Sequence, residues 1–455
     1  MRRHRIPEFV ASAIAGSLAV VVTVGMMLAA PRTVQAQTAP APAPTAPPDP
    51  SDAFFDDSVV HDVYLTINSR DWESLKTNYL DNTYYPSDFK WRDQVVRNIG
   101  IRSRGTGSRS GVKPGLRVDF NRYTSGQQFL GLKSFILRNN TQDASNMHER
   151  VSMLFFRRMG MKAEREAHAQ LYINNVYSGL YTIVESIDET FLQKNLGESN
   201  GNLYEFKFDN SGVPPFIFGY PGSDPALYTP LPFSPETNVV DPRGDLLERL
   251  FFTINATGDA AWKSLMAEFL DLSKFLRHLA IENFLAEEDG LTGDYGPNNF
   301  YLYRYANRNL FMVLPWDKSN TFWGVPSSDY PIFHNIDDGL ENHRNRLVVR
   351  ALADPALREV YLGALLECAD SAVAPPVASA RVTTQDAAPQ PGWMEAEIQK
   401  EYQQIRLAVA FDTTKISTNT EFEKAVADMT LFARQRSDAV RQQVAADRAK
   451  RAALR

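Results

Sequence analysis

Aspartate and asparagine side chains gather in the stretch 282–324, and their types suit the positioning of a metal ion on phosphate groups. Asp294 and Asn299 stand in a D-x-x-x-x-N spacing, and Asp317 follows in a Pro-Trp-Asp sequence. Enzymes that transfer phosphoryl groups use an aspartate at this spacing to orient the attacking hydroxyl and an asparagine to hold magnesium. A later aspartate adds to the oxygen ligands that Mg²⁺ prefers. The spacing therefore predicts Asp294 as the proton acceptor and Asn299 with Asp317 as metal ligands.

Asp289 competes with Asp294 for the role of proton acceptor. It lies in the sequence EEDGL, in the same loop, and a glycine follows it. Without a catalytic role, Asp289 would stand at the end of a helix, with Gly290 in the left-handed C′ position. Asp294 would likewise only cap a turn, and the pair at 298–299 would form an Asx-turn that leads into a strand. The residue types leave these assignments open.

A β-hairpin is expected to bring these side chains together. The runs FYLY at 300–303 and LFMVL at 310–314 are aromatic or aliphatic, and the polar turn YANRN separates them. A hairpin returns the chain to its starting point, so the loops that carry Asp294, Asn299 and Asp317 should meet at one end. From residue 271, a helix is expected to run through KFLRHLAIENFLAEE into the first of these loops.

A loop rich in glycine, serine and cations, RGTGSRSGVKPG at 104–115, lies between two strand-like stretches. Its backbone N–H groups and the side chains of Arg104 and Lys113 are candidates for phosphate contacts. Arg117, on the strand that leaves the loop, is a further candidate. The loop lacks the Walker spacing of P-loops, so the alternative is an exposed hairpin turn with solvated charges.

Residues 133–192 have the pattern strand, helix, strand, strand. Ser145 can cap a helix over 146–159, whose apolar residues follow a helical period, and Gly160 ends it. The runs AHAQLYI and LYTIV are joined by NNVYSG, which predicts a hairpin, and the chain leaves this hairpin at Glu185.

The first 36 residues have the features of an export signal. Three arginines precede an apolar run over 9–30, and the sequence VQA at 34–36 is a small-x-small cleavage site. We expect Sec-type export, with the protein secreted or located in the periplasm or cell envelope. If the segment is not cleaved, its apolar run is long enough to anchor the chain in a membrane. The residues 37–52, rich in proline and alanine, form a linker.

The charge and the cysteine content exclude several classes of protein. The full chain has a formal net charge of −6, and removal of the arginine-rich signal segment makes the mature chain more acidic. This charge argues against non-specific nucleic-acid binding. Cys368 is the single cysteine, so an intrachain disulfide and a cysteine metal cluster are excluded. The stability of the chain must then come from its hydrophobic core.

Two blocks of this sequence resemble the CotH kinase family, spore-coat and cell-envelope proteins with an atypical kinase-like fold. The family pattern has an Asp-Gly loop, an Asn before an aromatic strand, a second strand and Pro-Trp-Asp. Upstream it has Asn-Gly-x-Tyr-x-Gly-Leu-Tyr followed by Val-Glu. The matching blocks here are DGLTGDYGPNNFYLY with LPWD, and NNVYSGLYTIVE. The resemblance covers about residues 53–370.

The resemblance implies an α+β fold of two lobes. It predicts an N-lobe with an antiparallel sheet and a helix, a mixed and mainly helical C-lobe, and C-terminal helices. The expected division is a signal peptide at 1–36, a linker at 37–52, an N-lobe at 53–195, a C-lobe with a Pro/Gly/aromatic insertion at 196–370 and a helical extension at 371–455. In this order the segment after LYTIV is the hinge that meets an adenine. Glu185 either holds this hinge or is a plain carboxylate at a strand end.

The activity implied by the resemblance is a protein kinase that uses ATP and Mg²⁺ and phosphorylates Ser or Thr hydroxyls of an envelope or secreted protein. Three positions depart from the family pattern. His148 stands where many members have arginine, Asn175 replaces the turn glycine, and Ser319 replaces a common second aspartate after Pro-Trp-Asp. The presumed metal ligands are retained, but the change at Ser319 weakens the case for a second metal ion.

Two other classes of function compete with a kinase. One is a non-catalytic envelope or adhesion protein on the same fold, which export to a place where ATP is scarce would favour. The other is a secreted metal-dependent hydrolase, since the same oxygens could hold calcium or magnesium. Retention of Asp294, Asn299 and Asp317 together favours the enzyme. The substrate and the oligomeric state have no signal in the sequence.

Overall fold

The computed structural model describes residues 49–207, 215–324, 326–337, 339–376 and 390–454. The predicted signal peptide and all but the last residues of the predicted linker lie outside the described residues. The chain divides into the units Met1–Pro48 and Asp49–Arg455, and the described helices and strands all lie in the second unit.

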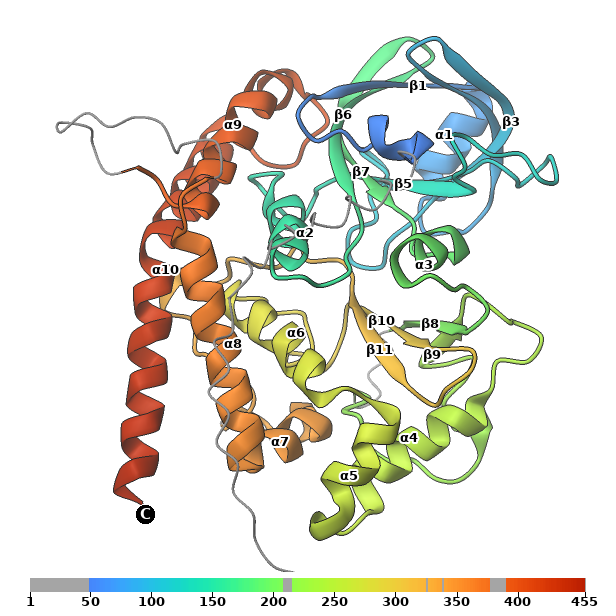
Figure 1. Cartoon of the computed structure of the whole chain (residues 1–455). Coiled ribbons are helices and arrows are strands. Elements are labelled where there is room, and N and C mark those ends of the chain that lie inside the picture. Colours follow the sequence, from blue (N-terminus) through green and yellow to red (C-terminus); the bar gives the residue numbers. More distant parts are fainter. Residues whose placement is uncertain (1–48, 208–214, 325, 338, 377–389, 455) are drawn as a thin grey trace, which may run out of the picture. The chain divides into compact units, whose positions relative to one another are not determined.

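Seven strands form a closed barrel in the first half of this unit (Figure 1). Their order is β1-β2-β3-β4-β5-β7-β6, and a parallel pairing of β1 with β6 closes the barrel, with His61 opposite Ala169. The family resemblance implied an antiparallel sheet, and the structure adds that a single parallel pair joins its two edges into a barrel. The strands are β1 (His61–Ile67), β2 (Tyr85–Trp91), β3 (Gln94–Ser103), β4 (Leu116–Asp119), β5 (Ser134–Arg138), β6 (Glu166–Ile173) and β7 (Val176–Glu185).

Aromatic side chains fill the barrel. Phe54 enters from a short 3-10 helix, η1 (Pro50–Ala53), and meets Phe89 and Phe135 in edge-to-face contacts. Such contacts add to the burial of apolar area, which is the main stabilising term here. The helix α1 (Ser69–Thr77) connects β1 to β2.

A second, four-stranded sheet has the order β11-β10-β8-β9. Its hairpin consists of β10 (Phe300–Arg304) and β11 (Phe311–Pro315), which confirms the hairpin predicted from the sequence. The other strands are β8 (Asn202–Phe206) and β9 (Phe233–Pro235). Phe300 pairs with Pro315, so the residues just outside this pair face each other at the end of the sheet.

Helices make up most of the remaining described chain. The helix α6 packs on α8, and α8 packs on α10, which runs beside it (Figure 1). The bounds are α2 (His148–Arg158), α3 (Glu189–Leu196), α4 (Gly244–Ala256), α5 (Asp259–Phe269), α6 (Leu272–Phe284), α7 (Arg346–Ala353), α8 (Pro355–Val373), α9 (Trp393–Phe411) and α10 (Asn419–Ala453). Mixed sheets and helices agree with the predicted α+β class.

Two predicted elements differ from those observed. The helix α6 ends at Phe284, earlier than expected, and the chain then continues as a loop through Asp289. The interpretation of Asp289 as a helix end followed by a left-handed Gly290 is therefore wrong. Gly290 is instead needed for space, because a Cβ there would lie 2.7 Å from the Glu282 carboxylate. The predicted insertion at 197–260 also contains the helices α4 and, at its end, the start of α5.

Candidate active site

The hairpin of β10 and β11 places Asn299 and Asp317 at the same end of the second sheet. The backbone N–H of Trp316 donates to the carbonyl of Asn299 over 3.2 Å, which continues the ladder by one step. Both Asn299 and Asp317 have a left-handed backbone, with φ of 56° and 48°. Asn and Asp tolerate this conformation better than other residues with a side chain. The sequence-based expectation that these two loops meet is confirmed.

Asp289 lies with this pair, held by amide side chains. Its carboxylate accepts hydrogen bonds from Asn299 Nδ2 at 2.9 Å and from Asn298 Nδ2 at 3.1 Å. Asn320 Nδ2 contributes a longer one of 3.4 Å. Burial raises the pKa of Asp289 and the nearby Asp317 charge adds to the rise, while the amide hydrogen bonds oppose it. A carboxylate with a raised pKa beside the predicted metal ligands suits a general base.

Asp294 faces a different direction. Its carboxylate lies 2.5 Å from His334 Nε2 and accepts a hydrogen bond from Asn335 Nδ2 at 3.2 Å. Its backbone N–H donates to the Glu288 carbonyl, which closes a tight turn around Gly293. Within the part of the chain that the structure describes, no hydrogen bond or ion pair joins it to Asn299 or Asp317. The expected convergence of Asp294 with the metal ligands is therefore corrected: the turn directs its side chain toward His334.

Arg138 and Glu149 complete the group, and both were missed from the sequence. Arg138, at the end of β5, donates from Nη1 to Asp317 Oδ1 at 2.6 Å and forms an ion pair with Glu149 of α2. Burial alone would raise the pKa of Asp317, but the charge of Arg138 and its hydrogen bond outweigh burial and lower it. Ser319 Oγ also donates to Asp317 Oδ1, over 3.0 Å. Asp317 is therefore held as a carboxylate.

The sequence contained a usable signal for this pair. In protein kinases a cation on a strand pairs with a glutamate on the following helix. Here a buried strand ends in Arg138, and the next helix carries Glu149 in its first turn. Arg138 lies one strand beyond the glycine-rich loop and Arg117, outside the stretch whose composition indicates phosphate binding.

The structure separates the three cations predicted to bind phosphate. Burial lowers the pKa of Arg104 and the charge of Arg138 lowers it further, while the charge of Asp317, which lies nearby, opposes both. Its guanidinium lies 5.6 Å from the centre of the Trp316 ring. Lys113 is instead buried in a 2.7 Å ion pair with Asp412, so it is not positioned for a phosphate contact. This is a correction, since Asp412 withdraws the ammonium group from the loop surface.

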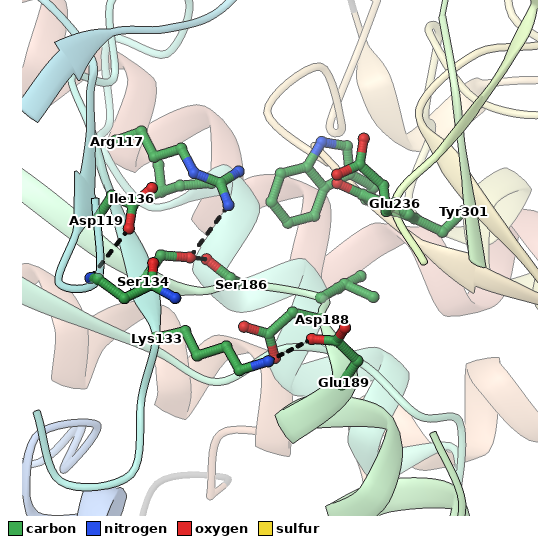
Figure 2. Close-up of a pocket in the computed structure, with 13 residues that line it drawn as sticks. Arg117, Asp119, Lys133, Ser134, Ile136, Ser186, Asp188, Glu189, Glu236 and Tyr301 are labelled. Atoms are coloured by element: carbon green, nitrogen blue, oxygen red, sulfur yellow. Dashed lines mark hydrogen bonds and ion pairs between the residues drawn. The ribbon is translucent and has the colours of Figure 1, made fainter. Parts of the chain in front are cut away.

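Arg117 lines a pocket of about 140 Å³ between the barrel and the second sheet (Figure 2). Its guanidinium donates to Ser134 Oγ at 3.3 Å, and Ser134 in turn contacts Ser186 at 2.9 Å. Tyr301 and Glu236 stand on the other side. The remaining lining residues are Asp119, Asn121, Lys133, Ile136, Ile187, Asp188, Glu189 and Trp316.

The pocket adjoins the segment that follows β7, which was predicted to be the hinge. Residues 186–189 supply part of its wall. Glu185 is not among the lining residues, because its carboxylate accepts from Arg165 Nη2 at 2.5 Å and from Arg165 Nε at 3.0 Å. The alternative interpretation of Glu185, a carboxylate at a strand end, agrees better with this geometry.

Trp316 connects the pocket to the cluster of side chains around Asp317. Its ring lines the pocket, and the guanidinium groups of Arg104 and Arg138 lie 5.6 Å and 5.9 Å from it. A flat molecule in the pocket would thus lie beside a cationic region that leads to Asp317. This arrangement suits a ligand with an aromatic base at one end and anionic groups at the other.

The family model described as "CotH kinase protein" matches residues 101–440. The inner spore coat protein H of Bacillus subtilis is 27% identical over 57% of this chain and 68% of its own length. Two Rhizopus delemar proteins, spore coat protein homolog 1 and invasin CotH3, are 22% and 24% identical over 63% and 59% of this chain. The matches cover 46% and 45% of these fungal proteins, so the chain spans less than half of their length.

Among solved structures, the Helicobacter pylori proinflammatory kinase CtkA matches 72% of this chain and 94% of its own chain. The identity is 10% and the TM-score is 0.27.

Proposed function

The chain belongs to the CotH kinase family, and on that premise we propose that it is an exported protein kinase that transfers the γ-phosphate of ATP to Ser or Thr hydroxyls. The observation that carries the proposal is the group of Asp289, Asn299 and Asp317 beside the ion pair of Arg138 and Glu149. Kinases need oxygen ligands for magnesium, a carboxylate near the attacking hydroxyl and a strand cation paired with a helix glutamate. All of these occur here at one end of one hairpin.

The donor set fits Mg²⁺ and ATP. Asn299 gives its amide hydrogens to Asp289, which leaves its side-chain oxygen as a ligand, and Asp317 is held ionised by Arg138. Mg²⁺ held there would neutralise phosphate charge, and ATP would supply the transferred group. The pocket lined by Arg117, Tyr301 and Trp316 would hold the adenine.

The remaining roles fall to groups of this chain. Arg138 and Arg104 would bind and orient the phosphates, in place of the Lys113 contact expected from the loop. Glu149 positions Arg138 through their ion pair. The carboxylate of Asp289 would accept the proton of the substrate hydroxyl. The side-chain amides of Asn298 and Asn299 would keep that carboxylate oriented toward the hydroxyl.

The site of action is proposed to be outside the cytoplasm, on an envelope or secreted protein. The export features of residues 1–36 support this, as do relatives whose names include spore coat protein and invasin. Among the described residues, no helix has both the length and the apolar character needed to cross a membrane.

The test is transfer from labelled ATP in the presence of MgCl₂, with the purified protein and a mixture of exported proteins as acceptors. The wild type should label itself or an acceptor on Ser or Thr. Asp317→Ala should lower the rate by about a hundredfold or more, because it removes a group that acts on transition-state charge. Asp438→Ala, an exposed aspartate of α10, is the matched control and should change nothing.

Absence of ATP binding by the wild type, measured as a shift of Tm with Mg-ATP, would contradict the nucleotide site. Binding without transfer would support a non-catalytic protein on the same fold, the second candidate. The relatives named invasins favour that candidate, and Asp317→Ala would then leave its adhesion unchanged.

A further inference from the structure

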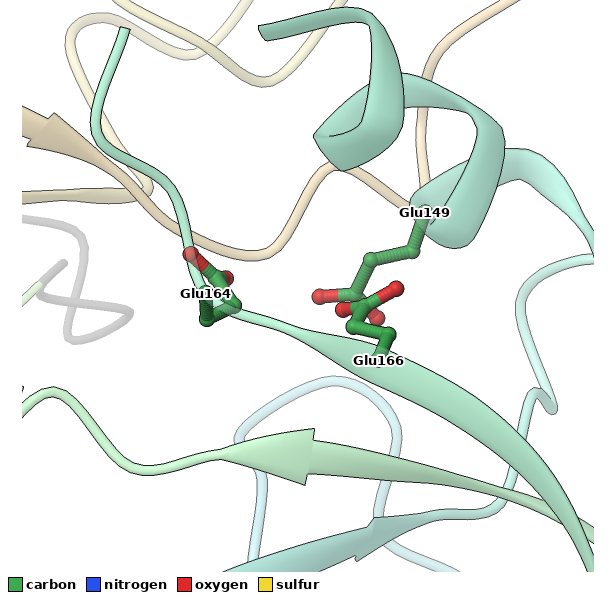
Figure 3. A group of neighbouring side chains, drawn as sticks. All are labelled: Glu149, Glu164 and Glu166. Carbon is green, nitrogen blue, oxygen red and sulfur yellow. The ribbon is translucent and has the colours of Figure 1, made fainter. Parts of the chain in front are cut away.

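Three glutamates meet in the interior next to the barrel (Figure 3). Glu149 comes from the first turn of α2, Glu166 begins β6, and Glu164 lies just before that strand. One oxygen from each of the three lies within 4.8 Å of the other two. Their exposed fractions are 5%, 0% and 1% for Glu149, Glu164 and Glu166, so water does not solvate them.

Apart from Glu149 Oε2, which pairs with Arg138, none of the carboxylate oxygens has a hydrogen-bond partner on another residue in the described part of the chain. An isolated ionised carboxylate in the protein interior is strongly unfavourable, so such a group takes up a proton, pairs with a charge or binds a metal ion. Burial raises the pKa of Glu164 and Glu166 well above its usual range, and raises that of Glu149 to about 8. The cluster therefore has more carboxylate oxygens than the neighbouring positively charged groups can bind.

The nearby arginines do not bind most of these oxygens. Arg138 forms an ion pair with Glu149 but shares its charge with Asp317. Arg157 donates to the backbone carbonyl of Glu164, not to its carboxylate. Glu149 pairs with Arg138 through Oε2, which leaves Oε1 directed elsewhere.

We propose that Glu149, Glu164 and Glu166 form a binding site for a hard divalent cation of the Ca²⁺ type, separate from the nucleotide magnesium. Carboxylate oxygens without sulfur or imidazole select hard ions. Opposite ligands of Ca²⁺ stand about 5 Å apart and those of Mg²⁺ about 4 Å apart. All three separations lie below 4.8 Å, within the span of a Ca²⁺ coordination sphere, and Ca²⁺ is held by protein carboxylates alone more readily than Mg²⁺, which keeps several waters.

The ion would connect α2 to the start of β6. Glu149 would then bind the ion through one oxygen and Arg138 through the other. A cation at this place would hold α2 at the distance from the end of β5 at which Glu149 can pair with Arg138. The site itself needs no nucleotide, so it is tested without ATP.

The experiment measures Ca²⁺ binding by equilibrium dialysis and the Tm of the purified protein with EDTA or CaCl₂, both without nucleotide. The wild type should bind one ion per chain at this site and gain a few degrees in Tm when Ca²⁺ is about a hundredfold above Kd. Glu164→Gln and Glu166→Gln should each weaken binding at least about tenfold and lose the gain in Tm. Glu359→Gln, an exposed glutamate of α8, is the matched control.

In EDTA the two variants should melt at or above the Tm of the wild type, because each removes a buried carboxylate from the cluster. This outcome also shows that they fold. Binding that survives in both variants but is lost in Asp317→Ala would place the ion at the nucleotide site and overturn the proposal. The same holds if no Ca²⁺ binds to the wild type, since protons would then neutralise the cluster.

Discussion

Asp289 and Asp294 lie close together in the sequence, but their carboxylates have different neighbours. Asp289 is surrounded by side-chain amides and lies near Asp317, whereas Asp294 contacts His334 on a loop beyond the hairpin. A general base must reach the substrate hydroxyl beside the transferred group, so its place relative to the metal ligands decides its role. On this geometry Asp289, which the family resemblance also indicated, is the better candidate.

We predict that Asp289→Asn lowers the rate of phosphoryl transfer by a factor of about 10²–10⁴, the usual effect of losing a general base. Asp294→Asn should keep most of the activity. Asparagine at 289 retains only one acceptor oxygen for its amide neighbours, so Tm is measured as well and the rates are compared far below it. Steady-state rates at saturating Mg-ATP report the difference. Loss of activity in Asp294→Asn alone would restore the assignment based on the D-x-x-x-x-N spacing.

Part of this site could be predicted from residue types. Asn299 and Asp317 flank a hairpin, and hairpin geometry alone brings them together. The choice between Asp289 and Asp294 could not be made, because it depends on how the loop 285–298 folds around its glycines. Arg138 and Glu149 were also hidden, since their pairing joins a strand to a helix and has no local spacing.

At the scale of elements, a buried ionic network supports the loop that carries Asp289. Glu282 of α6 forms ion pairs with Lys318 at 2.7 Å and with His278 at 3.1 Å. The same carboxylate accepts the N–H of Leu291, over 2.8 Å. Lys318 also donates to the carbonyl of Asn299. The helix, the loop and the end of the hairpin are thus joined through one glutamate.

The pKa of Glu282 predicts how this network responds to pH. Burial alone would raise the pKa, but the charges of Lys318 and His278 outweigh burial and lower it to about 2. A pKa below the usual 4.3 means that the glutamate stabilises the fold above that pH. This stabilisation decreases as the pH falls toward 2. Glu282→Gln should therefore cost about 3–5 kcal/mol at pH 7, and the difference from the wild type should shrink below pH 4.5.

Urea unfolding at a series of pH values measures this difference. Glu367→Gln, which breaks an exposed pair with Arg277, is the control and should cost less than about 1 kcal/mol. A cost for Glu282→Gln that stays constant down to pH 2 would contradict the assigned pKa.

The closure of the barrel lies beyond prediction from the sequence for a physical reason. The alternating burial of β1 indicates a strand with one face inward, and the hairpin of β6 and β7 has a clear turn at Asn174 and Asn175. The pairing of β1 with β6, however, joins residues more than a hundred positions apart. It is favoured by the packing of the barrel core, to which β1 and β6 contribute paired residues such as Val63 and Leu171.

At the scale of the whole described unit, the C-terminal helices are part of the same core as the candidate site. Arg436 of α10 is fully buried and donates to the carbonyls of Phe284 and Asn283 at the end of α6. It also donates to those of Ser328 and Tyr330. These contacts tie the predicted extension from residue 371 onward to the helix that leads into the loop of Asp289.

The link between the glycine-rich loop and the C-terminal helices rests on Lys113 and Asp412. Both side chains are 1% exposed, and Asp412 also accepts hydrogen bonds from Leu180 N–H at 3.0 Å and Thr414 Oγ1 at 2.7 Å. Desolvation opposes such a pair, but removal of one partner leaves a buried charge without compensation.

We predict that Lys113→Met lowers the free energy of unfolding by about 3–5 kcal/mol while leaving the KM for ATP unchanged at temperatures where the variant is folded. Asp412→Asn should also destabilise, and the double variant should lose clearly less than the two single losses together, because the residues contact each other. Chemical denaturation and ATP titration measure the two quantities, with Lys424→Met, an exposed lysine of α10, as the control of similar charge. A raised KM in Lys113→Met with unchanged stability would instead mean that Lys113 leaves Asp412 to bind phosphate, as the loop sequence first indicated.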